Sequence, residues 1–433
     1  MATNIVGATG IDKVQDGIIV NADIDTVAAS KLTGALPAIS GASLTNIPAA
    51  NITGTLPALA ATNLTAIPAA NITGTLPAIS GASLTSVRDT TGGRRNMVIN
   101  GDMQISQRGT SFTGLNTDSS AFEAYYLDRF LFGGDDAGIW TVTQDSESPV
   151  GFGSSMKMDC TTAKASLDAN SYAYVLHKIE RFNCQQLAFG GSSAKALTLS
   201  FWVRSPKTGT HFAEFYHGDS SGSSKRKSSH SYTVSTANTW EKKTITWAAG
   251  TGLRAITNNN GWGLMIIFYL VAGSNLTSGT HTGGAWHNTE ANRTPGQVNC
   301  ADSTSNNFYL TGVQLEVGST ATDFEHKTYG EELALCRRYY QAHHLTQHVP
   351  LCIDWMGGSN SGNMRGSFNF DVTMRVAPTQ GFLGSGTWYN QSNNAGAPDS
   401  MWFTPNMMIA YNDEGLNILG NSADDAITFS AEL

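Results

Sequence analysis

The chain has 433 residues, of which 14% are charged and 40% hydrophobic, and its formal net charge is −8. The charged fraction is well below the usual level of about 25%, and the acidic balance argues against a general nucleic-acid binder. The longest apolar run, residues 264–272, is too short to span a bilayer. The length allows two or three domains, and the richness in Gly, Ser, Thr and Asn favours a turn-rich, mainly β protein.

Residues 1–30 form a short head that is too small to fold alone. It either joins a multimer or docks on another protein. Residues 1–10 lack the basic start and apolar core of a secretory signal. The cysteines are odd in number and widely scattered, which predicts reduced, mostly buried thiols rather than disulfides: Cys160, Cys184, Cys300, Cys336 and Cys352. These features together predict synthesis in a reducing cytoplasm.

Residues 31–90 contain three copies of one 20-residue unit, KLTGALPAISGASLTNIPAA, NITGTLPALAATNLTAIPAA and NITGTLPAISGASLTSVRDT. A fixed period of this kind indicates a repeat architecture. The prolines exclude a continuous helix, and the short runs between Gly and Pro fit extended segments joined by turns. A flexible low-complexity linker is the alternative, but linkers are poor in regularly spaced large apolar residues.

One repeat is too small to close a core, and residues 32–87 carry no charge that would keep a single chain soluble. We therefore expect several chains to share one apolar seam. A threefold axis lets each chain offer one side chain per layer, so the sequence predicts a homotrimeric shaft.

Strand patterns begin after Gly92-Gly93-Arg94-Arg95. Residues 196–204 alternate as a half-buried strand, and residues 211–217 are expected to pair with it across the turn at 205–209. Residues 240–247 and 264–272 predict further strands. Residues 308–317 alternate but change phase at Gly312, which indicates a bulge. The sequence thus predicts a β-sandwich domain at 91–330.

Residues 329–340 predict one helix, with acids in its first turn and arginines in its last. In the domain division this connecting helix occupies 331–342, and a second β-sandwich occupies 343–433. Its expected strands are the alternating run 364–376 and the C-terminal segment 427–433. The complete prediction is a mainly β fold: a trimeric repeat shaft followed by two jelly-roll-like sandwiches with one connecting helix.

The C-terminal domain offers aromatic residues beside Gly, Asn and Ser, a combination that suits stacking on sugars and hydrogen bonding to them. Trp388 and Tyr389 are the first candidates for receptor binding, followed by Trp355 and Trp402. Burial in the core is the alternative for two or three of the four. A basic run on an expected hairpin tip is a second candidate contact, for acidic glycans or lipid head groups: Lys225, Arg226 and Lys227.

Other patterns give weak signals for catalysis or metal binding. Residues 218–222 match GxSxG but lack the strand-to-helix context of a hydrolase. His343, His344 and His348 lack metal-ligand spacing, and we expect no metal and no cofactor. Scattered carboxylates could serve a glycan-cleaving enzyme, but nothing brings two of them together: Asp354, Asp399, Asp424 and Asp425. The sequence therefore predicts no enzymatic activity.

Several segments resemble bacteriophage tail fibre proteins, notably those of marine cyanophages. They are NMVINGDMQISQRGTS at 96–111, YYLDRF at 125–130, GVQLEVGSTATDFEHKTYGEELALCRRYYQ at 312–341, the shaft repeats, and the pattern FxVxMRxxPT at 370–379. The middle domain also resembles a carbohydrate-binding jelly roll in the order of ALTLSFWVRS, TVSTANTWEKKTITW and NNFYLTGVQLEVG. Fold alone does not fix function.

The resemblance implies a homotrimer in the virion tail, assembled in the host cytoplasm. The segment 1–30 would hold it to a tail or adaptor protein, and the distal end would bind envelope polysaccharide or lipopolysaccharide on the host. A tailspike-like glycan-degrading enzyme and a purely structural virion connector remain the alternatives.

Overall fold

The computed structural model describes residues 94–117, 122–218, 226–344, 354–356, 364–384, 387–390, 400–412, 416–419 and 426–433. All of them belong to one compact unit of the chain. The expected head at 1–30 and shaft at 31–90 lie outside these residues.

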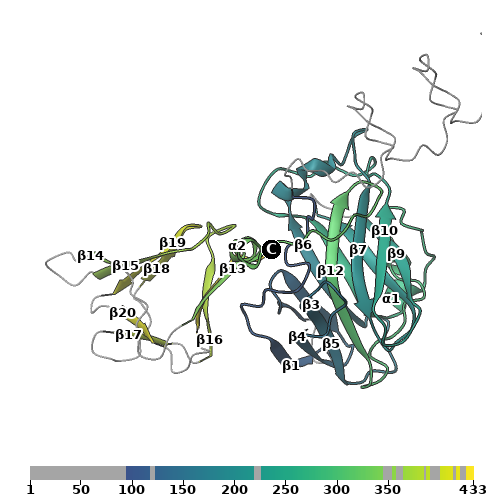
Figure 1. Cartoon of the computed structure of the whole chain (residues 1–433), viewed down its shortest axis with the longest axis horizontal. Helices are drawn as coiled ribbons and strands as arrows, with labels where there is room; N and C mark the ends of the chain where they lie inside the picture. The colour runs from purple at the N-terminus through teal and green to yellow at the C-terminus, as the bar shows by residue number, and fades with distance from the viewer. Residues whose placement is uncertain are drawn as a thin grey trace, which may run out of the picture. The chain divides into compact units, whose positions relative to one another are not determined.

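Two antiparallel sheets of six strands form the larger part of the described chain (Figure 1). The first sheet has the order β1 (Ser111–Asn116), β4 (Ile139–Asp145), β5 (Ser155–Thr162), β12 (Asn307–Val317), β7 (Leu197–Arg204) and β10 (Glu241–Trp247). The second has the order β2 (Phe122–Tyr125), β3 (Phe130–Asp135), β6 (Tyr172–Glu180), β11 (Trp262–Ala272), β8 (Gly209–His217) and β9 (Arg226–Val234). The predicted mainly β fold with sandwich-like sheets is confirmed.

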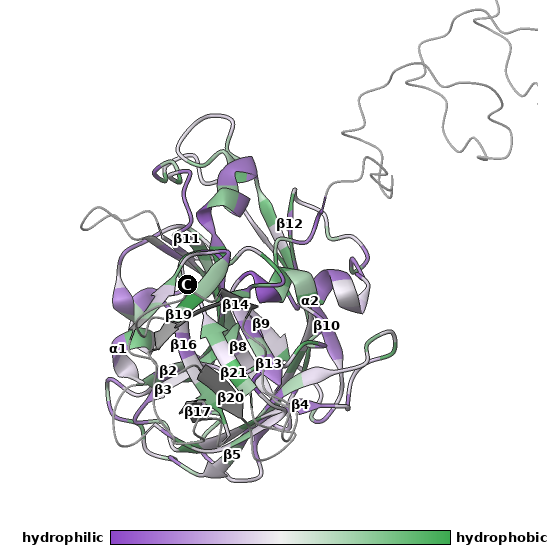
Figure 2. Ribbon diagram, turned by 90° about the vertical axis from the view of Figure 1, so that its left-hand side faces the viewer, coloured by the Kyte–Doolittle hydropathy of each residue, from purple (hydrophilic) through white to green (hydrophobic). Residues whose placement is uncertain are grey.

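The core between these sheets follows from side chains that alternate across each strand. Leu199, Phe201 and Val203 of β7 are fully buried and belong to the same cluster as Phe268 of β11. Phe201 and Phe268 meet edge to face with ring centroids 5.0 Å apart. Figure 2 shows green, hydrophobic stretches mixed with white and purple ones over the sheets.

Two features of these strands were predicted with different success. The bulge at Gly312 is confirmed: φ there is +61°, and the register of β12 against β7 shifts between Thr311 and Gln314. The expected pairing of 211–217 with 196–204 is wrong. β7 pairs with β10 and β12 in the first sheet, whereas β8 pairs with β9 and β11 in the second. The turn after β7 therefore carries the chain from one sheet to the other.

The described residues of the C-terminal part form three small antiparallel sheets. They are β13 (Tyr340–His344), β21 (Ala426–Ser430) and β16 (Thr379–Leu383); β14 (Asp354–Met356), β15 (Met364–Asn369), β19 (Met407–Asn412) and β18 (Ser400–Phe403); and β17 (Thr387–Asn390) with β20 (Leu416–Leu419). The thirteen-residue strand expected at 364–376 is shorter, because β15 ends at Asn369. Phe370 and Met374 nevertheless stay buried, and their N–H groups donate to Asn406 O and Pro405 O.

The described helical segments are η8 (Arg181–Leu187), α1 (Ser274–Thr277), η9 (Glu290–Asn292) and α2 (Tyr329–Arg337). Thr328 and Glu331 form a capping box at the start of α2. The helix ends earlier than expected, because Tyr340 already begins β13. Among the residues placed in the structure, no helix is long and apolar enough to cross a membrane. The expected burial of reduced thiols is confirmed for the four described cysteines, Cys160, Cys184, Cys300 and Cys336.

A buried polar cluster joins α2 and the C-terminal sheets to the sandwich. Arg338 donates two hydrogen bonds to Glu180, at 3.0 and 2.6 Å, and Tyr339 Oη donates to the same carboxylate at 2.7 Å. Arg129, which is 1% exposed, pairs with Glu432 next to β21 and lies 3.7 Å over the ring of Tyr339. The two parts therefore share buried charges, whose separation would be costly.

Candidate functional site

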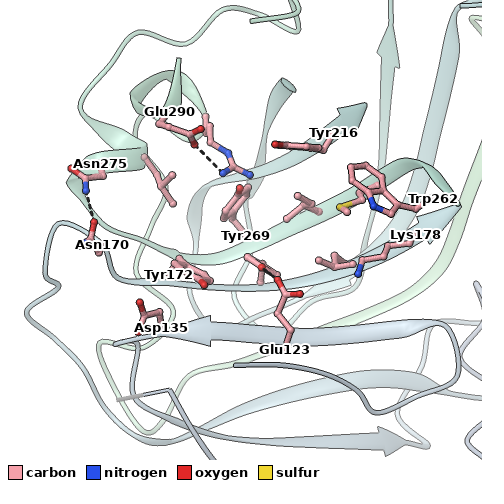
Figure 3. Close-up of a pocket in the computed structure, with 16 residues that line it drawn as sticks. Glu123, Asp135, Asn170, Tyr172, Lys178, Tyr216, Trp262, Tyr269, Asn275 and Glu290 are labelled. Carbon is pink, nitrogen blue, oxygen red and sulfur yellow. Dashed lines mark hydrogen bonds and ion pairs between the residues drawn. The ribbon is translucent and has the colours of Figure 1, made fainter. Parts of the chain in front are cut away.

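The outer face of the second sheet forms the floor of a cleft of about 600 Å³ (Figure 3). Successive residues of a strand point to opposite faces, and in β6 Ala173, Val175 and Ile179 point into the core. The alternate residues of the same strand line the cleft: Tyr172, Tyr174, Leu176 and Lys178. β11 does the same through Met265, Ile267 and Tyr269.

Four tyrosines and one tryptophan are among the sixteen residues that line the cleft. The rings of Tyr172 and Tyr174 are stacked with centroids 5.3 Å apart and planes at 11°, and Tyr174 meets Tyr269 edge to face at 6.0 Å. Tyr216 of β8 and Trp262 of β11 form a second pair at 6.0 Å. Such rings combine apolar faces with polar edges. They offer the kind of surface on which a flat, hydroxylated ligand can pack.

A surface segment after β11 supplies one wall. It includes α1 and η9 and contributes Asn275, Leu276 and Glu290 to the lining. Asn275 Nδ2 donates to Asn170 Oδ1 at 2.5 Å, which ties the segment to the turn before β6. In Figure 3 these two amides lie toward one end of the cleft and Trp262 toward the other.

Arg293 anchors this segment to the sheet. Its guanidinium donates to Glu214, from Nε at 3.1 Å and from the second terminal nitrogen at 2.6 Å, and its first terminal nitrogen reaches Glu290 at 3.1 Å. Glu214 is fully buried in β8 and also accepts from Ser229 at 2.9 Å. Burial alone would lower the pKa of Arg293, but Tyr269 and Glu214 raise it well above its ordinary value. The guanidinium is therefore fixed as a structural cation.

Glu123 and Asp135 lie on the β2–β3 side of the cleft. Glu123 accepts a hydrogen bond from Tyr174 Oη. Gly133, opposite Glu123 in the β2–β3 pair, leaves the space these side chains use. A Cβ at that position would lie 2.8 Å from Glu123 Cγ and 3.2 Å from the Tyr174 ring.

Protonation in the cleft favours hydrogen bonding over proton transfer. Burial, followed by the bond to Glu123, raises the pKa of Tyr174 above its ordinary value, and burial also raises the pKa values of Tyr172 and Tyr216. Their hydroxyls stay protonated at neutral pH. Burial opposes ionisation of Glu290, but Lys227 and Arg293 keep its pKa below the ordinary value. The site can hold a ligand through ring contacts, hydroxyls, amides and carboxylates.

The aromatic candidates predicted from the sequence belong to strands of the C-terminal part. Trp402, in β18, is 66% exposed. Trp355 lies in β14, and Trp388 and Tyr389 lie in β17, but their side chains are outside the described part of the structure. Trp402, whose side chain is described, does not line the cleft.

The basic run is divided by the structure. Lys225 lies outside the described residues, and Arg226 begins β9 without a described side chain. Lys227 is not on an exposed tip: it is 5% exposed, its ammonium pairs with Glu290, and its N–H donates to His287 O at 2.9 Å. Lys227 thus helps to hold the wall of the cleft in place through its contact with the lining residue Glu290.

The histidine and carboxylate candidates are only partly described. His343 packs its ring against Phe368, with centroids 4.6 Å apart, and lies 3.2 Å from Gln341 Oε1, whereas His344 is exposed. Asp354 lies in β14. His348, Asp399, Asp424 and Asp425 and most of the GxSxG match lie outside the described residues. Across the described ranges, no group of three or more His, Cys, Asp or Glu could hold a metal ion.

The cleft was missed at the sequence level because its lining comes from separate parts of the chain. One signal was present: in residues 172–180 the apolar face alternates with tyrosines and a lysine rather than with small polar residues. That pattern indicates a strand whose outward-facing side chains contact a ligand or another part of the protein rather than solvent alone.

Comparison with known proteins finds similarity in structure alone. No protein-family model matches the chain. No curated protein matches it either.

Among solved structures, the enzymatically active domain of bacteriophage CBA120 tailspike protein 4 is similar over 51% of this chain and 21% of its own length, with 13% identity and a TM-score of 0.26. The CBM22-1-GH10 modules of Clostridium thermocellum xylanase 10B, solved with xylohexaose, cover 52% of this chain and 29% of theirs at 12% identity and a TM-score of 0.26. A family 11 carbohydrate-binding module of a Clostridium thermocellum cellulase covers 50% and 96% at 12% identity and a TM-score of 0.24. At these values the similarities assign no function to this chain.

Proposed function

We propose that the chain is a glycan-binding adhesin that holds its ligand in the cleft on the outer face of the second sheet. The observation that carries this proposal is the cleft lining, in which Tyr172, Tyr174, Tyr216 and Trp262 stand beside the amides Asn170 and Asn275. Sugar rings present apolar C–H faces and hydroxyl edges. Aromatic rings and short polar groups complement both.

Binding is favoured over catalysis by the chemistry of the lining. A general acid or base works best with a pKa near neutrality. The pKa values of the cleft tyrosines are raised further from neutrality, and Arg293 and Glu290 are engaged with each other. We therefore propose a binder without enzymatic activity.

The setting we propose is a bacteriophage tail. The resemblance of segments 96–111, 125–130 and 312–341 to phage tail fibres supports this setting, as do the shaft repeats at 31–90. In this proposal residues 1–30 attach a homotrimer to the virion, and three linked clefts bind host envelope polysaccharide or lipopolysaccharide. Linking weak sites raises the effective concentration of the second and third, so modest single-site affinity suffices.

A glycan microarray probed with the purified full chain tests the proposal. Tyr172→Ala should weaken binding about tenfold, as expected when a central aromatic contact is removed. Trp402→Ala is the matched control, because it removes an exposed ring outside the cleft. Retention of binding by Tyr172→Ala together with its loss in Trp402→Ala would move the site to the C-terminal sheets, as the sequence predicted. Release of oligosaccharides would instead support a glycan-degrading enzyme, and absence of binding to glycans and cells a structural connector.

A further inference from the structure

The charged groups of the cleft divide into two sets. The cations of the wall are already neutralised by carboxylates of the protein. Arg293 uses all three of its guanidinium nitrogens on Glu214 and Glu290, and Lys227 pairs with Glu290 as well. Lys178, on the floor, donates to Leu433 O at 2.8 Å.

The carboxylates on the β2–β3 side are not neutralised in this way. Glu123 is an exposed residue that accepts its hydrogen bond from a neutral phenol, Tyr174. Asp135 lies near Tyr172 at the end of β3 and is partly exposed. Among the described residues neither carboxylate has a cation in direct contact. Glu123 does lie close enough to Lys178 to oppose the lowering of that lysine's pKa by burial.

We propose that the cleft selects glycan segments without acidic groups and excludes segments that carry uronate, sulfate or phosphate, with Glu123 and Asp135 as the selecting residues. This inference rests on the proposed function, because it names the class of ligand for the same cleft. The two carboxylates accept hydrogen bonds from sugar hydroxyls. A sugar hydroxyl at this position can donate a hydrogen bond to a carboxylate, whereas an acidic group at the same position is repelled by it.

The physical basis is the cost of bringing like charges together in a partly desolvated site. Two anions a few ångströms apart repel more strongly at a protein surface than in bulk water. Relief would require a cation that an acidic group could recruit. Recruiting Arg293 would leave the fully buried Glu214 without its partner, and Lys178 on the floor already lies near Glu123 and donates to Leu433 O. Removing one member of a buried ion pair is strongly unfavourable. An acidic chain thus meets repulsion from Glu123 and Asp135, while Arg293 and Lys178 are already engaged with groups of the protein.

The experiment compares one polymer with its own acidic derivative. The full chain is first screened on the glycan microarray. The uncharged polysaccharide that binds best is then titrated beside the same polymer in which part of the primary hydroxyls has been oxidised to carboxylates. The variants are Glu123→Gln/Asp135→Asn and, as a matched control, Glu147→Gln/Asp159→Asn. The control removes two carboxylates from the first-sheet side of the sandwich.

The wild-type protein should bind the oxidised polymer about tenfold more weakly than the parent, and high salt should narrow this difference because it screens exposed charges. The Glu123→Gln/Asp135→Asn variant should lose most of the discrimination, and the control variant should keep it. Equal or stronger binding of acidic glycans would overturn the inference while leaving the proposed function in place. The inference would also be overturned, with the proposed function left in place, if the Glu123→Gln/Asp135→Asn variant discriminated between the two polymers as strongly as the wild-type protein. Failure to bind any glycan would overturn both.

Discussion

Replacing Arg293 by Met removes the partner of Glu214 and thereby tests how the wall of the cleft is held. Glu214 is fully buried and receives two contacts of 3.1 Å and one of 2.6 Å from the guanidinium. After the substitution the carboxylate keeps the bond from Ser229 at 2.9 Å and a long contact from Tyr269 at 3.4 Å. It would then be a buried charge without a counter-ion.

Breaking a buried ion pair costs about 3–5 kcal/mol. The Arg293 side chain is 15% exposed, so some water reaches the site and the lower end applies. A loss of about 3 kcal/mol should lower the melting temperature by about 6–12 °C for a sandwich of this size. Glu214→Gln/Arg293→Met should recover most of the loss, because the charge is removed together with its partner.

Thermal and urea unfolding of the full chain at one fixed protein concentration provide the measurement. Arg204→Met is the matched control: its partner Glu147 is 48% exposed, so about 0–1 kcal/mol is expected. The reasoning fails if Arg293→Met is no more destabilising than this control, or if the double variant is as unstable as the single one.

Three further predictions concern backbone, pH and ligand. Gly312→Ala places a Cβ at φ +61° and 2.7 Å from the Phe152 ring, so calorimetry should show a loss of about 1–2 kcal/mol or more; an unchanged melting temperature would contradict it. Burial lowers the pKa of His211 to about 4, whereas the unfolded value is about 6.5. Between pH 4 and 6.5 His211 is therefore protonated in the unfolded chain and neutral in the folded chain. The free energy of unfolding should fall as the pH drops from 6.5 to 4, by about 1.4 kcal/mol per pH unit. His211→Gln should show a shallower loss in urea midpoints, and identical slopes would refute the assignment. Gly133→Ala should weaken glycan binding several-fold through displacement of Glu123, with circular dichroism unchanged; unaltered affinity would exclude that contact.

The strands were predictable where apolar and polar residues alternate. Residues 196–204 alternate cleanly, and β7 follows them almost to the residue. The alternation did not reveal that Thr198 and Ser200 on the polar face are buried as well. The bulge in β12 was visible because Gly312 interrupts the alternation. The destination of β8 was not predictable, since a turn that folds back into a hairpin and a turn that crosses to the other sheet use the same residue types. The early end of β15 was hidden because Phe370 and Met374 continue an apolar pattern after the strand has ended.

The cleft was beyond prediction for a different reason. Its parts come from 123–135, 170–178, Tyr216 and 262–293, and register between strands, rather than spacing along the chain, brings them together. Lys227 shows the same limit. In the sequence it belongs to a basic run, but in the sheet it lies opposite Tyr216 and pairs with Glu290.

The way the cleft wall is fastened has a consequence for how this molecule can diversify. The segment from α1 to Arg293 is held to the sheet at Asn275 and at Arg293. The stretch between these two residues includes the short helix η9. The same stretch contains His287 and Glu290, which contact Lys227 of β9. Insertions placed between these contacts would leave the twelve-stranded framework and the attachments of the segment intact. Related proteins could in this way differ in the wall of the cleft, and hence in the ligand that they bind, while keeping the same β-sandwich.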